Sequence, residues 1–360
     1  MRRGKKLGIG MGTGLGVLLL ILILWCRHSV AAADFYAIHL YPCISACLTW
    51  LASPLPFSLT EWGVVLAVLT FIGLIVRAIR RRERWWKCVL KEAALLLGVY
   101  IWFYGAWGIN YYRSDIYART GSIAMPYEES EFQEFLEEFS AQLNENWCPA
   151  PAFEGIGDAE LESRVKAWYA ALPPDLGLCQ PRSWQHPKRI TFNRLFSSVG
   201  VLGFLGPAFD EMHVNREITP LERPFVFAHE YAHVLGVSSE AEANFWAFEA
   251  SHASDSQAIR YSALFSLLTF TWNNIRSLLG EEAFQEWVAT LRPEILEDMQ
   301  SIHTYWQDRR RPWLARVQHR FYNFFLRSNR IADGTKNYGQ VLRLVLTFAS
   351  LHDHEDGPEG

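Results

Sequence analysis

Two histidines and a glutamate in one short segment, His229-Glu230-x-x-His233, have the types and spacing of a zinc-binding pair with a catalytic base. On a helix, residues four apart stand on the same face, so both imidazoles can reach one metal ion. Glu230 then projects near a water on that ion and can take its proton. The segment predicts a hydrolytic Zn²⁺ site with His229 and His233 as ligands and Glu230 as general base.

A third protein ligand is expected on the helix that follows. Gly236 is a helix stop shortly after the second histidine, and a new helix starts at Ser239, so the chain can double back across the metal. Ser239 and Glu242 form an S-x-x-E capping box, which gives Glu242 a structural role and leaves Glu240 free to ligate. We favour Glu240 and keep Glu242 as the alternative. Asn244 shares the face of Glu240 and is expected to hydrogen-bond a ligand.

Other interpretations of these residues stay open. Both histidines can be satisfied by the backbone or by Glu240 inside a buried helix. A purely structural zinc is another alternative, although such sites usually close with four protein ligands and this segment offers three. An oxyanion donor is also needed. The candidates are Tyr261, His213 and His252, and each is more simply explained as an ordinary surface or core polar residue.

The segment resembles the gluzincin zinc peptidases, in which a glutamate in an E-x-x-A-[D/N] helix joins HExxH; here that helix matches residues 240–244. The resemblance implies a zincin-like fold, with Glu240 as third ligand and Asn244 as its hydrogen-bonding neighbour. The whole chain also resembles a bacterial family of uncharacterised membrane proteins named for a HEYAHQ signature. In this chain Val234 stands where that signature has glutamine. The matching landmarks are WGINYYR at 107–113, GFLGPAFDEMHVN at 203–215, PFVFAHEYAH at 224–233, EAEANF at 240–245, RYS at 260–262 and YNFFLRSN at 322–329.

The expected function is a membrane-anchored zinc metallopeptidase whose partner is a peptide or protein in the cell envelope. Segment 203–215 is similar to the edge strand that lines the cleft of such peptidases, and a structural hairpin is an equal alternative. Two other functions stay open. One is a non-catalytic membrane sensor or scaffold that retains the metal helix, and the other is a zinc amidase acting on a cell-wall component.

The elements that must position these residues are mainly helices with a small β-sheet, an α+β arrangement. Apolar residues recur at helical spacing in 129–147 and 158–172, whereas short apolar runs with glycines favour strands and turns in 189–214. Helical patterns resume at Phe225 and are interrupted at Pro293 and Pro312. The aromatic run at 321–326 is expected in the core.

The first part of the chain has the composition of a membrane region. We expect residues 1–109 to contain three transmembrane helices, at about 8–26, 62–76 and 89–109, because each is a predominantly apolar stretch and the first has no charged residue. A signal peptide is a weaker interpretation of the first stretch. The apolar connection that contains 34–52 is interrupted by Pro42, Pro54 and Pro56, so we expect segment 34–52 to be interfacial or partly re-entrant.

Basic residues predict the orientation of a multi-pass cell-membrane protein. Seven lysines and arginines lie between Arg77 and Lys91, and four more lie before residue 7, so both segments are expected in the cytoplasm. Three crossings then place residues 110–360 outside as one extracytoplasmic domain. A fourth crossing would invert this topology.

Charge and cysteine content limit the remaining classes. Lys and Arg number 12 against 4 Asp and Glu up to residue 108, and 22 against 34 after it. The lipid bilayer is therefore an expected partner, and nucleic acid is not, because phosphate contact needs clustered basic residues on the soluble part. Cys148 and Cys179, the only cysteines after residue 110, are equally consistent with a disulfide and with buried thiols.

Overall fold

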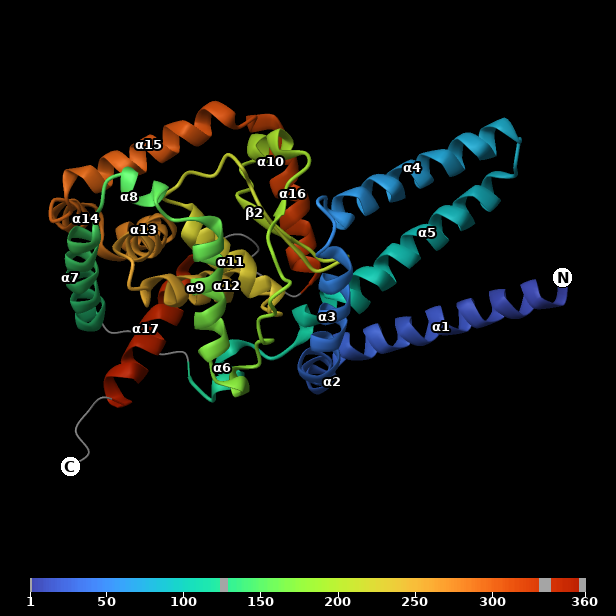
Figure 1. Cartoon of the computed structure of the whole chain (residues 1–360), viewed down its shortest axis with the longest axis horizontal. Helices are drawn as coiled ribbons and strands as arrows, with labels where there is room; N and C mark the ends of the chain where they lie inside the picture. The colour runs from blue at the N-terminus through green and yellow to red at the C-terminus, as the bar shows by residue number, and fades with distance from the viewer. Residues whose placement is uncertain (1, 124–128, 330–337, 356–360) are drawn as a thin grey trace. The chain divides into compact units, whose positions relative to one another are not determined.

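The computed structural model describes residues 2–123, 129–329 and 338–355 (Figure 1). The described chain is mostly helical with one sheet of three strands, which confirms the predicted α+β composition. It divides into two compact units. Unit 1 comprises residues 1–114, 182–191 and 205–212, and unit 2 comprises residues 115–181, 192–204 and 213–360. Two short later segments therefore belong with the N-terminal helices, a division that one boundary near residue 109 does not describe.

The helices of unit 1 include three long ones, α1, α4 and α5 (Figure 1). In chain order they are α1 Arg2–His28, α2 Val30–Phe35, the π-helix η1 Tyr36–Leu40, α3 Tyr41–Ala52, α4 Leu59–Arg80, α5 Trp85–Ala106 and the 3-10 helix η2 Gly108–Tyr112. Helix α5 packs against both α1 and α4. The short basic turn after Arg80 makes α4 and α5 a helical hairpin.

Three helical stretches within the described residues are long and apolar enough to cross a membrane, namely Val30–Ala52, α4 and α5. Only 6% of the apolar part of α4 and of α5 is buried, so their large apolar side chains lie on the surface of the unit, as lipid-facing side chains do. Val30–Ala52, which contains the segment expected to be interfacial, is helical throughout and 33% buried. Helix α1 offers the shorter apolar stretch Gly14–His28; the predicted span 8–26 begins among side chains outside the described set.

One face of α3 carries polar contacts to the later segments of unit 1. Asp210 is buried and accepts hydrogen bonds from Tyr41, at 3.1 Å, and from Ser45. The ammonium group of Lys188 donates to the carbonyl of Ala52 at 2.7 Å, at the end of the helix. A helix with this many polar partners is covered by protein on that face.

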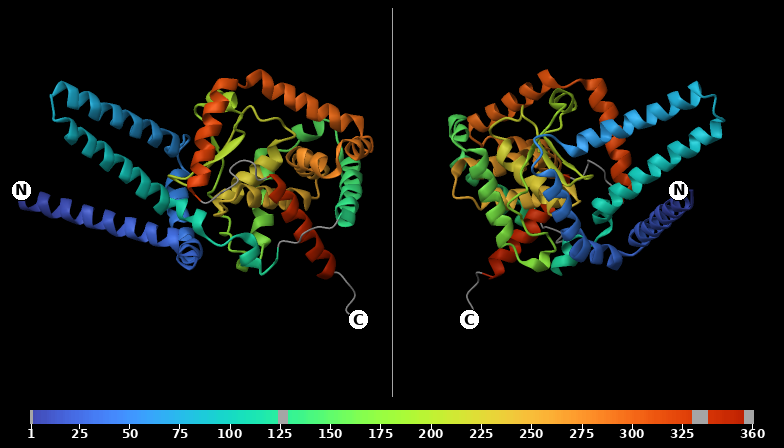
Figure 2. Two further views of the ribbon diagram at one scale, coloured as in Figure 1. Left: turned by 180° about the vertical axis from the view of Figure 1, so that it is seen from behind. Right: turned by 45° about the vertical axis from the view of Figure 1, so that its right-hand side comes forward.

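Unit 2 is a helical assembly around α11, α12 and α13 (Figure 2). Its helices are α6 Ile116–Thr120, α7 Glu129–Asn146, α8 Pro151–Glu154, α9 Asp158–Ala171, η3 Pro174–Leu176, α10 Asn193–Val199, α11 Arg223–Val234, α12 Glu240–His252, α13 Gln257–Leu279, α14 Glu281–Val288, α15 Pro293–Arg309, α16 Pro312–Ser328 and α17 Tyr338–Glu355. The predicted helices at 129–147 and 158–172 are confirmed as α7 and α9. Pro293 and Pro312 begin α15 and α16, where a missing N–H costs nothing.

The three strands are β1 Lys188–Arg189, β2 Gly203–Gly206 and β3 Glu211–Val214, in the order β1-β3-β2. Strand β2 is therefore at an edge of the sheet. The expectation of strands and turns in 189–214 is right at both ends and wrong in the middle, because α10 occupies Asn193–Val199. Asn193 begins that helix and Gly200, with φ of 80°, ends it.

The observed burial of side chains tests two further expectations, for the aromatic run at 321–326 and for the two cysteines. The aromatic run at 321–326 is not core throughout: Phe321 and Phe324 are 72% and 74% exposed. They point away from the unit because the buried face of α16 is the opposite one, which carries Leu326. Cys148 and Cys179 are both buried and no disulfide joins them in the described chain, which agrees with the alternative of buried thiols.

Candidate metal centre

Helix α11 carries the HExxH segment and is fixed at its first turn. The Ser262 hydroxyl on α13 accepts a hydrogen bond from the Phe225 N–H at 3.3 Å and donates to the Leu221 carbonyl at 2.6 Å. Pro224 stands in the first turn, where its ring favours helix start. Most of the helix is buried, and Phe225, Ala228 and Ala232 face the interior. The helix is therefore rigid at its start and presents His229, Glu230 and His233 in its last two turns.

The turn between α11 and α12 brings the third ligand back. Helix α11 ends at Val234, and Gly236 adopts φ of 96°, a left-handed conformation that glycine adopts readily. The side chain of Ser239 then accepts from the Glu242 N–H at 3.3 Å, which begins α12. Glu240 lies in the first turn of α12, where the helix dipole favours a carboxylate.

His229, His233 and Glu240 form one group, as the sequence predicts. The Nε2 atoms of the two histidines are 3.2 Å apart. Glu240 Oε2 lies 3.4 Å from His229 Nε2 and 3.8 Å from His233 Nε2. Each of the three residues offers one ligand atom, and these three atoms lie within 4.8 Å of one another. The two rings are nearly perpendicular, at 88°, so their nitrogens converge on one point from different directions.

These separations fit the donors of a tetrahedral zinc ion. Ligands at about 2.1 Å from zinc stand about 3.4 Å from one another at tetrahedral angles. The three distances of 3.2, 3.4 and 3.8 Å match the three edges that such ligands would define. Two neutral imidazoles and one carboxylate are also a common catalytic donor set for zinc, with the fourth corner left for solvent.

Hydrogen bonds orient two of the three candidate ligands. His233 Nδ1 lies 2.7 Å from the Val237 carbonyl, so Nδ1 carries the proton there and Nε2 keeps its lone pair for a metal. Glu240 Oε1 accepts a hydrogen bond from the Tyr322 hydroxyl on α16, which leaves Oε2 facing the histidines. His229 Nδ1 is buried and has no hydrogen-bond partner among the described residues.

The charges of the group perturb its own ionisation. Burial alone would raise the pKa of Glu240, but hydrogen bonds and charge from the two imidazoles hold it well below its usual range. Burial lowers the pKa of His233, and Glu240 reverses this and raises it to about 9. A metal ion would take the place of these protons, since ligation requires neutral imidazoles. The ionised Glu240 carboxylate therefore stabilises positive charge next to it, either on the imidazoles or on a bound cation.

Glu230 lies beside the group as a buried carboxyl. It is 5% exposed, and its Oε2 atom has no hydrogen-bond partner among the described residues. Burial raises the pKa of Glu230 to about 7, although the charges of His229 and His233 act to lower it. A carboxyl with a pKa near neutrality can both accept and return a proton.

Strand β2 packs directly on Glu230. A Cβ atom at Gly203 would lie 2.6 Å from Glu230 Cγ and 2.7 Å from its Oε1, so any larger residue at this position would displace the Glu230 side chain. The edge strand and the carboxyl are in van der Waals contact.

Glu242 and Asn244, the alternative ligand and the expected neighbour of a ligand, do not join the group of His229, His233 and Glu240. Glu242 is buried, and its carboxylate accepts from Arg119 and from Trp246 Nε1, the latter at 3.1 Å. It is thus a structural residue, although its partners are not those of a complete capping box. Asn244 is buried one turn after Glu240 and makes no hydrogen bond to a metal-group residue in the described chain.

The three oxyanion candidates are occupied elsewhere. The Tyr261 hydroxyl donates to Asp298 at 2.8 Å in the core. His252 Nε2 lies 2.9 Å from Gln142 Oε1. His213 is fully buried and stacks on Phe204 with ring centroids 4.2 Å apart.

Sequence reasoning missed Tyr322 and Arg119. Both come from segments remote in sequence from HExxH, so no spacing rule connects them to it. The assignment of 321–326 to the core hid Tyr322, although alternation of exposed and inward positions at helical spacing in α16 separates it from Phe321 and Phe324.

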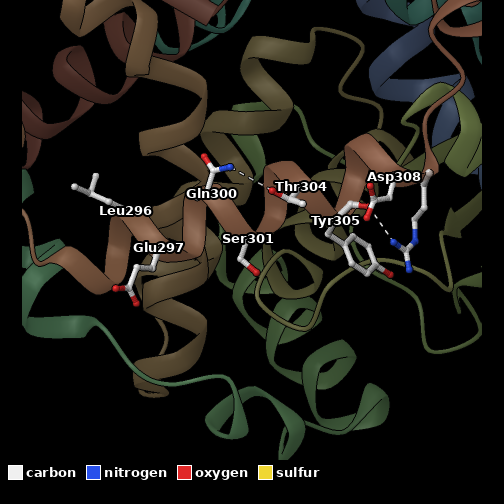
Figure 3. A pocket seen from close by; sticks show the side chains of 8 residues that line it. Leu296, Glu297, Gln300, Ser301, Thr304, Tyr305 and Asp308 are labelled. Carbon is white, nitrogen blue, oxygen red and sulfur yellow. Dashed lines mark hydrogen bonds between the residues drawn. The ribbon is translucent and has the colours of Figure 1, made fainter.

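Two hollows on the described surface of unit 2 lie away from the His229, His233 and Glu240 group. A shallow groove of about 690 Å³ runs along α15, where Gln300 donates to Thr304 at 3.3 Å (Figure 3). A smaller cavity of about 150 Å³ lies between Cys148, Asp298 and Tyr305. The groove is one face of a single helix and has no converging polar groups of the kind that binding sites show.

The fold and the site define a class: a mostly helical chain with membrane-length apolar helices and a His-His-Glu group on two consecutive helices. The chain belongs to the family described as "Protein of unknown function (DUF3810)", whose model matches residues 36–346. No protein of curated function and no solved structure matches the chain.

Proposed function

We propose that the protein is a membrane-anchored zinc metallopeptidase of the gluzincin type. His229, His233 and Glu240 hold the metal, and Glu230 is the general base. The observation that carries the proposal is the pairing of a convergent three-ligand group with a buried carboxyl that has one unpartnered oxygen. A histidine pair satisfied by Glu240 explains the first feature but not the second, because leaving a buried carboxyl oxygen unpaired costs stability.

Each residue of the proposed site has a definite task in amide hydrolysis. Zinc, when bound, supplies a Lewis acid that lowers the pKa of a coordinated water towards about 7. Glu230 accepts the proton of the attacking water at its unpartnered oxygen and later passes it to the leaving amine. Tyr322 holds Glu240, and Val237 holds His233, so that the ligand atoms stay in place during the reaction.

An extended peptide is the substrate that the site favours. Strand β2 lies at the edge of the sheet and touches Glu230 through Gly203. Edge strands pair with extended backbones, and a glycine lets that backbone come close. A peptide or protein of the cell envelope bound along β2 would place an amide carbonyl near Glu230.

The anchoring of the site follows from unit 1. Basic residues lie at the start of α1 and around the turn between α4 and α5, and α5 packs against both helices. We propose that both basic ends face the cytoplasm, that α1, α4 and α5 cross, and that unit 2 is extracytoplasmic. The polar contacts of α3 with Asp210 and Lys188 support an interfacial position for 34–52.

Metal analysis with matched variants tests the proposal. We expect about one zinc per full-length chain in detergent and much less in His229→Ala, because a lost imidazole opens the site. Glu230→Gln should keep the zinc and lose hydrolysis of a peptide library by about 1,000-fold. If wild type and Glu230→Gln process all peptides equally, the protein is not a peptidase and the sensor or scaffold alternative is favoured. If cell-wall fragments are cleaved while peptides stay intact, the amidase alternative is favoured.

A further inference from the structure

Helix α16 presents an exposed apolar stripe that no described part of unit 2 covers. Its members are Trp313, Val317, Phe321 and Phe324, which are 64%, 44%, 72% and 74% exposed. At 3.6 residues per turn they fall within an arc of about 80°. Exposed aromatic side chains aligned in this way mark a contact surface, since soluble proteins rarely leave such patches open.

The same helix is held to unit 2 by its other faces. The Arg311 N–H donates to the Ser198 carbonyl at 2.8 Å at the start of the helix, and Leu326 is fully buried near its end. Tyr322, on the face opposite the stripe, donates to Glu240. The exposed stripe therefore lies on the side of α16 away from the contacts that hold this helix to unit 2.

Charge beside the stripe indicates what covers it. Arg316, Arg320 and Arg327 are exposed along one flank, and Arg309 to Arg311 precede the helix. Residues 309–328 contain 6 arginines and no Asp or Glu, although the chain after residue 108 carries 34 acidic against 22 basic residues. A local cluster of arginines beside aromatic side chains is the pattern of a helix that lies in a lipid interface.

We propose that α16 docks unit 2 on the surface of a bilayer that contains anionic phospholipid. The aromatic stripe enters the headgroup boundary and the flanking arginines contact lipid phosphates. The membrane-length helices of the same chain keep such a surface available to it. This proposal is independent of the metallopeptidase proposal, because no metal or hydrolysis is required.

Photo-crosslinking of the full-length chain in liposomes tests the docking. Phe321 or Phe324 is replaced by p-benzoylphenylalanine, and Leu278, an exposed apolar residue of α13 in the same unit, is the matched control position. After irradiation, mass spectrometry identifies lipid and peptide adducts. In vesicles of phosphatidylcholine with phosphatidylglycerol, we expect at least about fivefold more lipid adduct at positions 321 and 324 than at 278.

Removing either the arginine charges of α16 or the anionic lipid should remove the excess of lipid adduct at positions 321 and 324 over position 278. Arg316→Glu combined with Arg320→Glu, or vesicles of phosphatidylcholine alone, should reduce the adducts at 321 and 324 several-fold; thermal melting checks that the variant is folded. Lipid adducts equal to those at 278 would overturn the proposal. Adducts to peptides of α1–α5 or to a second copy would overturn it too, since protein would then cover the stripe. Adducts that do not depend on anionic lipid or on the arginines would overturn the assignment to anionic phospholipid.

Discussion

Both carboxylate oxygens of Glu240 are occupied, one by the two imidazoles and one by the Tyr322 hydroxyl. Hydrogen bonds of this kind fix the orientation of a metal ligand and raise its affinity. Tyr322→Phe removes only the hydroxyl and should weaken zinc binding about tenfold, measured by competition with a zinc-sensitive dye. Tyr305→Phe on α15, which removes a hydroxyl that donates to the Glu217 carbonyl, is the matched control. An unchanged zinc affinity in Tyr322→Phe would show that the hydroxyl does not position Glu240.

Gly203 controls the position of the proposed base. Gly203→Ala places a methyl group 2.6 Å from Glu230 Cγ, so the carboxyl must move while the three ligands are untouched. Misplacing a catalytic group by about 1 Å costs about 100-fold in rate. We expect peptide hydrolysis to fall 10- to 100-fold, as that estimate allows, with zinc content unchanged.

Gly157→Ala is the matched control for this variant, because its added methyl group meets no atom within 4 Å. It should hydrolyse peptides at the wild-type rate. Full activity of Gly203→Ala would mean that the Glu230 side chain can shift without effect, which would contradict its role as base.

At the scale of elements, the α11-turn-α12 segment was readable from the sequence because every signal in it is local. The spacing of the histidines, the glycine after the helix and the serine before Glu240 each act within a few residues, and the structure has each where expected. Helix α10 could not be predicted in this way, because short apolar runs such as that in Asn193–Val199 are equally typical of a strand.

The contact between α3 and the turn before β3 has a pH dependence of its own. Burial raises the pKa of Asp210 to about 7, against hydrogen bonds from Ser45 and Tyr41 that lower it. An unfolded aspartate titrates near 3.9, so the folded chain holds this proton more tightly. The free energy of unfolding should therefore fall as pH rises from about 4 to 7, by up to about 4 kcal/mol from this group.

Asp210→Asn removes the ionisation and tolerates the local φ of 54°, which asparagine adopts more readily than most residues. In detergent, its melting temperature should equal that of wild type near pH 4 and exceed it by several degrees at pH 8. Asp255→Asn, at an exposed position, should follow wild type at both values. Parallel curves for wild type and Asp210→Asn would exclude this carboxyl as a source of pH dependence.

At the scale of the whole molecule, the proposed topology is tested by reporter fusions. Alkaline phosphatase, which is active only outside the cytoplasm, should be inactive after Glu83 and active after Ser122. The basic turn between α4 and α5 and the following crossing by α5 give this result. The opposite pattern would show that Val30–Ala52 also crosses.

Long-range organisation is what the sequence left undetermined. Hydropathy and charge identified the long apolar helices, because length and composition are properties of one segment. The return of residues 182–191 and 205–212 to unit 1, and the contact of Tyr322 with Glu240, join segments far apart in the chain. No periodicity within either partner encodes such a pairing.

The unbridged cysteines of unit 2 determine how this part of the chain responds to redox conditions. Burial raises the pKa of Cys148 to about 11, so its sulfur stays a protonated thiol at neutral pH and reacts slowly with oxidants. No disulfide joins Cys148 and Cys179 in the described part of unit 2. Dithiothreitol should leave its unfolding temperature unchanged, and the fold is equally compatible with reducing and oxidising surroundings.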